Sequence, residues 1–311
     1  MTRSWNQVTI IGCGLIGASF ALALRRANAC KRIAGWDSSK ADLDEAVRTG
    51  VVDEVDSAFA AEGATNPVSV SDLIYLAMPV KEIIAFLRER GRQVKAEAVI
   101  TDAGSTKVEI CRTARLHLTE SQQFVGGHPV AGSHLQGLAH ARSDLFAGAP
   151  YVLIADEDLK EGPAHTALRE TLDLLGATVT CMTATEHDRV MALVSHLPQV
   201  VSSALATVTR EHSDADALVS LSGTGYRDMT RLASSSWSMW GDILSTNSTE
   251  TAAALDALIG KLTSVRDELR ECSRQGLELN TTRKLFQEPG PHEAIRPSKE
   301  INNASHTDTQ H

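Results

Sequence analysis

The sequence predicts an α/β domain with a parallel sheet, followed by an all-helical domain. Short apolar runs rich in β-branched residues alternate with helical patterns, at residues 8–11, 33–36, 73–77, 99–101, 124–125, 151–154 and 177–182. Strands that alternate with helices in this way build parallel β-α-β units. Between Glu186 and Gln275 only helical spacings and turns follow. We therefore predict domains at residues 1–183 and 184–281, with the polar residues 282–311 forming a disordered tail.

The bulk composition excludes several classes of protein. The chain has 311 residues, enough for two domains, and a net charge of −9, which argues against the basic face of a nucleic-acid binder. Its five cysteines are scattered without a Cys-x-x-Cys pair, so neither a disulfide framework nor a metal site is indicated. Reduced cytoplasmic thiols are the simpler interpretation.

The apolar run at residues 8–24 resembles a signal peptide or a short membrane span. It lacks a basic leading cluster and an Ala-x-Ala exit, and three glycines interrupt it. It is also shorter than the roughly 20 apolar residues that a span requires. No other stretch is expected to approach membrane length, so the sequence predicts a soluble, cytoplasmic protein.

A dinucleotide-binding turn is predicted where the first strand meets the first helix. Gly12, Gly14 and Gly17 form the pattern Gly-x-Gly-x-x-Gly in that position. The first glycine permits the tight turn, the second lets the backbone approach a pyrophosphate, and the third lets helix and strand pack closely. The pyrophosphate would lie at the helix N-terminus, where Leu15 and Ile16 begin the helix. This context predicts a Rossmann-type domain.

An acidic residue sets the expected cofactor. Asp37 lies 20 residues beyond Gly17, at the end of the second strand, where a carboxylate would bind the ribose hydroxyls. A 2′-phosphate would be repelled there, so NAD is favoured over NADP. The alternative is that Asp37 serves only as a helix cap or turn residue. Met78 and Pro79, which end the third strand, complete the predicted cofactor contacts.

Two candidate catalytic residues follow predicted strands. Ser105 lies in Asp102-Ala-Gly-Ser-Thr-Lys107, and His128 lies in the turn Gly-Gly-His-Pro. In open α/β sheets ligands bind beyond the carboxyl ends of the strands, so both side chains are expected to face the cofactor. Pro129 keeps His128 out of the helical region. A single histidine is more often a structural residue, but this setting favours a functional one.

The long helix from Glu186 to Arg210 carries a polar stripe. Asp188, Ser195 and Gln199 are separated by seven and four residues and therefore share a face, with His196 beside them. Pro198 removes one helical hydrogen bond and frees a carbonyl. A polar stripe beside a kink favours the wall of a pocket, and a solvated face is the alternative.

A later segment is rich in groups that could bind a carboxylate. It contains Arg227 and Arg231, followed by Trp240 in a Met-Trp pair. An arginine can hold a carboxylate with two parallel hydrogen bonds. A salt bridge with Asp228 or another neighbour is the alternative for Arg227, and Arg231 is the better candidate for a substrate contact.

Taken together, these segments resemble the prephenate/arogenate dehydrogenase family of tyrosine biosynthesis. The resemblance covers roughly residues 8–250 and rests on motifs at 12–17, 102–107, 126–132, 195–198, 227–233 and 239–243. It implies a Rossmann domain followed by a helical dimerisation domain. The long apolar helices, which one small domain cannot cover, also favour a homodimer.

The resemblance also implies a reaction, the oxidative decarboxylation of a cyclohexadienol with hydride transfer to NAD⁺. His128 would accept the hydroxyl proton of the substrate, as suits a neutral imidazole. Ser105 would orient that hydroxyl and Arg231 would bind a substrate carboxylate. Asp188 would orient the arginine.

Two positions depart from the pattern of prephenate-type members. His134 stands where these often carry Glu, and Gln199 where they often carry a second His. Both are expected near the substrate, so the choice between prephenate and arogenate stays open, with prephenate preferred on family frequency.

Two further alternatives come from other classes of protein. A β-hydroxyacid or imine dehydrogenase usually places a catalytic lysine at the start of the central helix, and residues 186–189 contain none. An NAD-sensing protein without catalytic activity would not need Ser105, His128 and Arg231 together.

Overall fold

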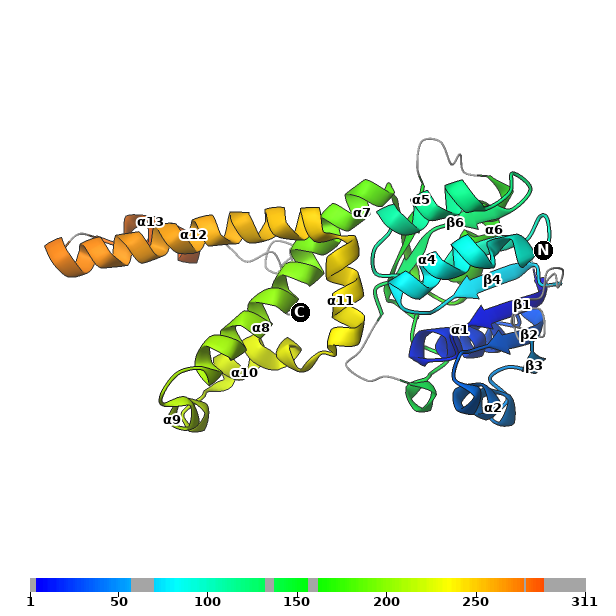
Figure 1. The fold of residues 1–311 in the computed structure, drawn as a ribbon, viewed down its shortest axis with the longest axis horizontal. Helices are drawn as coiled ribbons and strands as arrows, with labels where there is room; N and C mark the ends of the chain where they lie inside the picture. Colours follow the sequence, from blue (N-terminus) through cyan, green and yellow to red (C-terminus); the bar gives the residue numbers. More distant parts are fainter. Residues whose placement is uncertain (1–3, 57–69, 132–136, 156–161, 277, 288–311) are drawn as a thin grey trace, which may run out of the picture. The chain divides into compact units, whose positions relative to one another are not determined.

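The computed structural model describes residues 4–56, 70–131, 137–155, 162–276 and 278–287 (Figure 1). The chain divides into two compact units, residues 1–254 and residues 255–311, which we describe in turn. The first unit holds both sheets and the helices that contribute to the candidate site.

The main sheet has six parallel strands in the order β3-β2-β1-β4-β5-β6. The strands are β1 (Trp5–Ile11), β2 (Cys30–Trp36), β3 (Glu54–Val55), β4 (Leu73–Leu76), β5 (Val99–Asp102) and β6 (Gln123–Val125). The order reverses between β1 and β4, and ligands of such folds bind beyond the carboxyl ends of the strands at this point. The predicted parallel sheet is confirmed.

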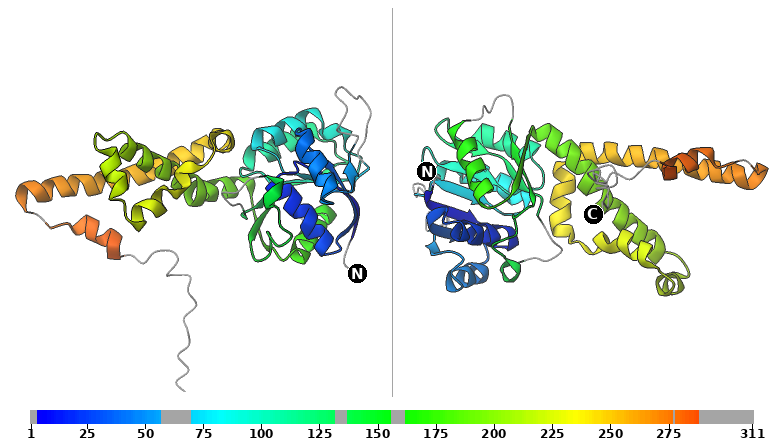
Figure 2. Two further views of the ribbon diagram at one scale, coloured as in Figure 1. Left: turned by 90° about the horizontal axis from the view of Figure 1, so that it is seen from below. Right: turned by 180° about the vertical axis from the view of Figure 1, so that it is seen from behind.

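Helices cover both faces of this sheet (Figures 1 and 2). They are α1 (Leu15–Arg26), α2 (Lys40–Arg48), α4 (Val80–Glu89), α5 (Val108–His117) and α6 (Pro163–Leu174). Successive strand residues point to opposite faces. Ile10 and Tyr75 pack in the core with α1 and α6, whereas Ile11 and Ile74 pack in the core with α4 and α5. Both faces of the strands are therefore buried, as their continuous apolar sequences require.

A second sheet of three strands follows, formed by β7 (Gly127–Pro129), β8 (Pro150–Ile154) and β9 (Thr178–Met182). β7 runs antiparallel to β8, and His128 pairs with Val152. The expectation that His128 lies in a turn is therefore wrong, because it lies in a short edge strand. Pro129 is compatible with this strand because an edge leaves one backbone side unpaired.

One continuous helical segment begins the helical part, as α7 (Ala184–Met191), a π-helical turn η3 (Ala192–His196) and α8 (Leu197–Arg210). The side chain of Thr183 accepts a hydrogen bond from the backbone of Glu186, whose own side chain bonds back, so a capping box begins the helix. Pro198 is the second residue after the π-turn, and it cannot donate the regular helical hydrogen bond. Such turns are frequent at functional sites.

Four helices and a short turn complete this part of the fold. They are α9 (Ala215–Ser220), α10 (Thr224–Thr230), the 3-10 turn η4 (Arg231–Ser234), α11 (Trp237–Thr246) and α12 (Ser248–Gln275). The predicted all-helical character of the region after β9 is confirmed.

The segment Ala184–Arg210 is 27 residues long, and by length and composition it could cross a membrane. The expectation that no stretch beyond residues 8–24 approaches this length is therefore wrong. His187, Asp188 and Gln199 on this helix are buried and hydrogen-bonded to other elements of the same fold. These contacts are typical of a helix packed within a protein.

The second unit contains the end of α12 and α13 (Asn280–Gln287). The carboxylate of Glu268 on α12 accepts hydrogen bonds of 2.7 Å from the backbone N–H groups of Thr281 and Thr282 at the start of α13. The hydrogen bond from the Thr282 hydroxyl, together with these backbone bonds, lowers the pKa of Glu268 to about 2. The prediction that a disordered tail begins at residue 282 is wrong for residues 282–287, and residues 288–311 lie outside the described chain.

Candidate active site

The glycine turn between β1 and α1 has the geometry that a pyrophosphate requires. Gly12 has φ +94°, and a Cβ there would lie 2.4 Å from the carbonyl oxygen of Ala77 and 3.0 Å from Met78 Cγ. A Cβ at Gly17 would lie 2.0 Å from the carbonyl oxygen of Gly12, whereas one at Gly14 would meet open space. α1 begins at Leu15 without a side-chain cap, so its first N–H groups remain available to an external anion.

Asp37 joins this turn to the end of β2. Its carboxylate accepts the N–H of Cys13 at 2.7 Å and the N–H of Ser39 at 2.8 Å. Asp37 therefore stabilises the local turn, which was the alternative role considered for it. The residue that caps α2 is Ser39. Each carboxylate oxygen keeps a lone pair for a ribose hydroxyl. Burial, with the charge of Asp37, raises the pKa of the Cys13 thiol to about 12, so this cysteine is unreactive.

Met78 and Pro79 lie at the neighbouring strand end. Pro79 is the residue that precedes α4, and Met78 approaches the glycine turn as described above. The turn, the carboxylate and these two residues therefore fit a dinucleotide that crosses the carboxyl ends of β1, β2 and β4.

A fully buried ion pair links β5 to β7. The ammonium of Lys107 contacts the carboxylate of Asp102 and donates a 2.8 Å hydrogen bond to the carbonyl of Gly127. Asp102 also accepts the N–H groups of Gly104 at 2.8 Å and Gly127 at 3.1 Å. These contacts fix the backbone before and after Ser105, at Gly104 and Lys107, and directly before His128, at Gly127. The sequence singled out the motif at 102–107 but assigned Lys107 no role.

Asp188 caps α5 from the neighbouring helix α7. Its carboxylate accepts the N–H of Lys107 at 2.7 Å and the N–H of Val108 at 2.9 Å. A buried carboxylate at a helix N-terminus is stabilised by the free N–H groups and the helix dipole. Asp188 therefore joins the helical region to the sheet domain. It makes these bonds instead of the expected contact with Arg231.

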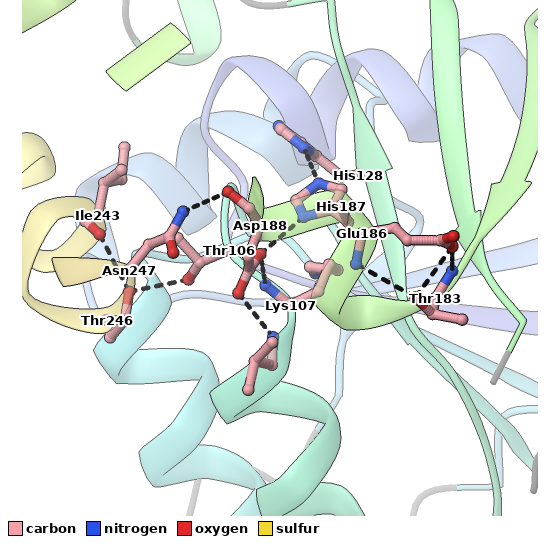
Figure 3. A network of polar contacts seen from close by, with 12 residues as sticks. Thr106, Lys107, His128, Thr183, Glu186, His187, Asp188, Ile243, Thr246 and Asn247 are labelled. Atoms are coloured by element: carbon pink, nitrogen blue, oxygen red, sulfur yellow. Dashed lines mark hydrogen bonds and ion pairs between the residues drawn. The ribbon is translucent and has the colours of Figure 1, made fainter. Parts of the chain in front are cut away.

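His128, His187 and Asp188 form a hydrogen-bonded chain (Figure 3). His128 Nδ1 lies 2.8 Å from His187 Nε2, and His187 Nδ1 lies 2.7 Å from Asp188 Oδ1. Burial holds the pKa of His128 well below its usual 6.5, and the charges of neighbouring histidines and Lys107 lower it further. Burial also lowers the pKa of His187, although the Asp188 contact opposes this shift. His128 is therefore neutral at cellular pH and can accept a proton.

His196 at the end of the π-turn packs against Trp240 of α11. The two rings meet edge to face with centroids 6.0 Å apart, which brings these two predicted residues together. The side-chain amide of Asn247 lies 3.2 Å from His196 Nδ1 and donates to the carbonyl of Asp188 at 2.7 Å. Burial lowers the pKa of His196 to about 4, so this ring is also neutral.

Gln199 is tied to the turn that carries Arg231. Its amide nitrogen donates to the carbonyl of Leu232 at 2.7 Å, and its amide oxygen accepts the hydroxyl of Ser235 at 3.2 Å. These bonds hold η4 in place, and the expected contact of Gln199 with substrate stays a prediction. Arg231 is exposed, and within the described chain no ion pair engages it. Arg227 donates to the carbonyl of Ser222 at 3.0 Å, and the alternative of a salt bridge with Asp228 is not seen among the described residues.

The remaining predicted site residues have different outcomes. Ser105 is half-buried in the loop between β5 and α5, and Ser195 is half-buried in the π-turn. His134 lies outside the described residues. Sequence reasoning missed His187, although its position next to Asp188 on the polar helix was a usable signal.

The comparisons with known proteins agree with this architecture. Residues 20–181 match the family model of the prephenate dehydrogenase nucleotide-binding domain, and residues 183–283 match that of the prephenate dehydrogenase dimerisation domain. Prephenate dehydrogenase of Bacillus subtilis is 33% identical over 279 residues, which cover 89% of this chain and 74% of the relative.

Two solved structures extend the likeness to the fold. A prephenate dehydrogenase from Aquifex aeolicus, in complex with hydroxyphenyl propionate and NAD⁺, is 26% identical with a TM-score of 0.81, covering 92% of this chain and 97% of that one. Synechocystis arogenate dehydrogenase is 28% identical with a TM-score of 0.73, covering 93% of this chain and 99% of that one. With both family models matched in order along most of its length, this chain belongs to the prephenate dehydrogenase family.

Proposed function

We propose that this protein is an NAD-dependent prephenate dehydrogenase of tyrosine biosynthesis, which converts prephenate to 4-hydroxyphenylpyruvate. The observation that carries the proposal is His128, a neutral buried imidazole with one ring nitrogen bonded to His187. Its other ring nitrogen is the candidate proton acceptor. The family relatives and the NAD⁺ complex of the Aquifex enzyme support the substrate and the cofactor.

The proposed reaction needs a proton acceptor, assigned to His128, and a hydride acceptor, assigned to the bound dinucleotide. NAD⁺, when bound, supplies the acceptor for a hydride. His128 takes the proton of the ring hydroxyl while the carbon that bears this hydroxyl loses its hydride. The bond to the ring carboxylate then breaks, its electrons complete the aromatic ring, and carbon dioxide leaves. The proton held by His128 returns to the resulting phenolate oxygen, which gives the phenol of the product. Ser105 is assigned to hold the hydroxyl oriented toward His128.

The cofactor is assigned to the glycine turn and Asp37. The N–H groups at Leu15 and Ile16 would hold the pyrophosphate, and Asp37 would bind the ribose hydroxyls. Met78 and Pro79 would line the same strand ends.

Asp37→Ser is expected to weaken the preference for NAD⁺. The variant loses the group that accepts hydrogen bonds from the ribose and the charge that repels a 2′-phosphate. The ratio of kcat/KM for NAD⁺ to that for NADP⁺ should therefore fall about 10- to 100-fold. This range corresponds to the roughly 1.5–3 kcal/mol of a charge-assisted hydrogen bond. Steady-state kinetics with each cofactor measures this ratio. Asp44→Ser, at an exposed position on α2, is the matched control. An unchanged ratio would remove Asp37 from the ribose site.

Arg231→Ala is expected to raise the KM for substrate with a smaller effect on kcat. Arg231 is assigned to a substrate carboxylate, and loss of one charge-assisted contact should raise KM about 10- to 100-fold. Arg227→Ala is the control, because Arg227 is bonded to the carbonyl of Ser222 in its own neighbourhood. Initial rates at varied substrate concentration separate the two variants. A KM for Arg231→Ala equal to that of the control would exclude this assignment.

The second candidate substrate is arogenate, the amino analogue of prephenate. It is favoured by the likeness to Synechocystis arogenate dehydrogenase and by the absence of a charged group at Gln199. We assign the protein to prephenate because the relatives from Bacillus subtilis and Lactococcus lactis are named for that substrate, and the relative from Zymomonas mobilis for cyclohexadienyl compounds. Initial rates with each substrate and each of NAD⁺ and NADP⁺ test the assignment. The highest kcat/KM is expected for prephenate with NAD⁺.

We further assign the protein to a soluble, cytoplasmic homodimer that binds a small-molecule substrate. The match to a dimerisation domain supports the assembly. In the described part of the helical region, large apolar side chains remain exposed. Val208, Leu221 and Trp237 have exposed fractions of 70%, 84% and 75%. A homodimer would cover such a surface. Light scattering on the purified protein gives the molecular mass, which distinguishes a homodimer from a monomer.

A further inference from the structure

The hydrogen-bonded chain of Asp188, His187 and His128 fixes the position of every ring proton in it. Asp188 Oδ1 accepts the N–H of Lys107 and lies 2.7 Å from His187 Nδ1. An ionised carboxylate only accepts hydrogen bonds, so His187 Nδ1 must carry a hydrogen. In a neutral imidazole the other ring nitrogen is then a bare acceptor. His187 Nε2 therefore presents a lone pair to His128.

The same argument passes to His128. Its Nδ1 lies 2.8 Å from His187 Nε2, and two bare nitrogens would repel at this distance. His128 Nδ1 must therefore be the donor. A neutral His128 then has its lone pair on Nε2, which points away from His187 in Figure 3. Both rings are buried, so water does not compete for these bonds.

We propose that His187, held by Asp188, is a positioning residue that fixes His128 in the tautomer with hydrogen on Nδ1. His128 Nε2 is then the atom that gains the proton from the substrate hydroxyl. This inference rests on the proposed function and adds to it the residue that selects the reacting nitrogen. When Nε2 gains its proton, the Nδ1 hydrogen stays on His128 and its bond to His187 becomes charge-assisted and stronger.

The surroundings of the pair favour this arrangement. The charged and titratable groups that act on the two rings are Lys107, Asp102, Asp188 and His196. The ammonium of Lys107 acts against a positive charge on His128, whereas the Asp188 contact raises the pKa of His187 against the effect of burial. Asp188 is itself fixed by the N–H groups at the start of α5, so its orientation does not depend on the histidines.

Nitrogen NMR on the free protein tests the tautomer without substrate. The protein is labelled with ¹⁵N-histidine, and His128→Asn and His187→Gln spectra assign the two rings among the 11 histidines. At neutral pH we expect hydrogen on Nδ1 and none on Nε2 for His128. Hydrogen on Nε2 of His128 would overturn the proposal. This result does not depend on turnover, so it stays separate from any failure of the proposed function.

Two substitutions at His187 test the consequence for catalysis. His187→Phe removes the acceptor, so His128 should populate the other tautomer and kcat should fall about 10- to 100-fold, with the KM for NAD⁺ unchanged. His187→Gln retains an oxygen that can accept from His128 Nδ1, and it should recover most of that loss. Equal kcat values for wild type and His187→Phe would contradict the proposal, as would an unaltered His128 tautomer in that variant. If His187→Phe does not fold, the wild-type spectrum still decides.

Discussion

His128→Asn is expected to lower kcat by about 10² or more while the affinity for NAD⁺ stays close to that of the wild type. General acid–base groups contribute about 10²- to 10⁴-fold to a rate, and asparagine cannot take up the proton. Its amide can still occupy the position of Nδ1 beside His187, so the edge strand should persist. Steady-state turnover gives kcat, and quenching of intrinsic fluorescence gives the cofactor affinity. An equal loss of both would indicate misfolding.

The pH dependence of the wild type belongs to the same prediction. Burial and neighbouring charges hold the pKa of His128 well below 6.5, so the base stays unprotonated as the pH falls through this value. The kcat/KM for substrate should therefore keep its plateau to a pH well below 6.5, and His128→Asn should lack the acidic fall. A wild-type profile that already falls near pH 6.5 would contradict the assigned environment.

Lys107→Met is expected to destabilise the protein by about 3–5 kcal/mol, the usual cost of leaving one member of a buried ion pair without its partner. The side chains of Lys107 and Asp102 are both fully buried. The substitution keeps the approximate volume but leaves the Asp102 charge buried without its counterion. It also leaves the carbonyl of Gly127 without its side-chain donor. Denaturant unfolding, followed by circular dichroism, measures the loss.

A double-mutant cycle separates charge from packing in this result. In Lys107→Met with Asp102→Asn the buried charge is gone, while an amide can still bond to part of the surrounding backbone. The double variant should therefore be more stable than Lys107→Met alone. Loss of stability that simply adds between the two single variants would show that the pair does not interact as the structure indicates.

The sheet and most helices could be predicted from sequence because their signals are local. The apolar residues Leu43 and Ala46 are spaced as on one helical face, and both are buried in α2 (Lys40–Arg48). The apolar runs at residues 73–77 and 99–101 form β4 and β5, which are buried on both faces. The glycine turn was predictable for the same reason, since its spacing reflects steric needs within one strand and one helix.

The errors in the predicted site came from long-range contacts. Asp188 was placed on a polar stripe, but the group that it binds lies 81 residues away, at Lys107. β7 is only three residues long, and it forms because β8 lies beside it. Gln199 was placed on the same stripe, and its partners, the carbonyl of Leu232 and the hydroxyl of Ser235, lie 33 and 36 residues further along the chain. Such partners depend on tertiary structure that no local pattern contains.

Product stoichiometry tests the central claim most directly. Purified protein is mixed with limiting prephenate and excess NAD⁺, and reduced nicotinamide, carbon dioxide and 4-hydroxyphenylpyruvate are measured together. We expect one equivalent of each per prephenate consumed, with none formed at a comparable rate by His128→Asn. Reduced nicotinamide without carbon dioxide, or no turnover of prephenate by the folded protein, would contradict an oxidative decarboxylation of prephenate at this site.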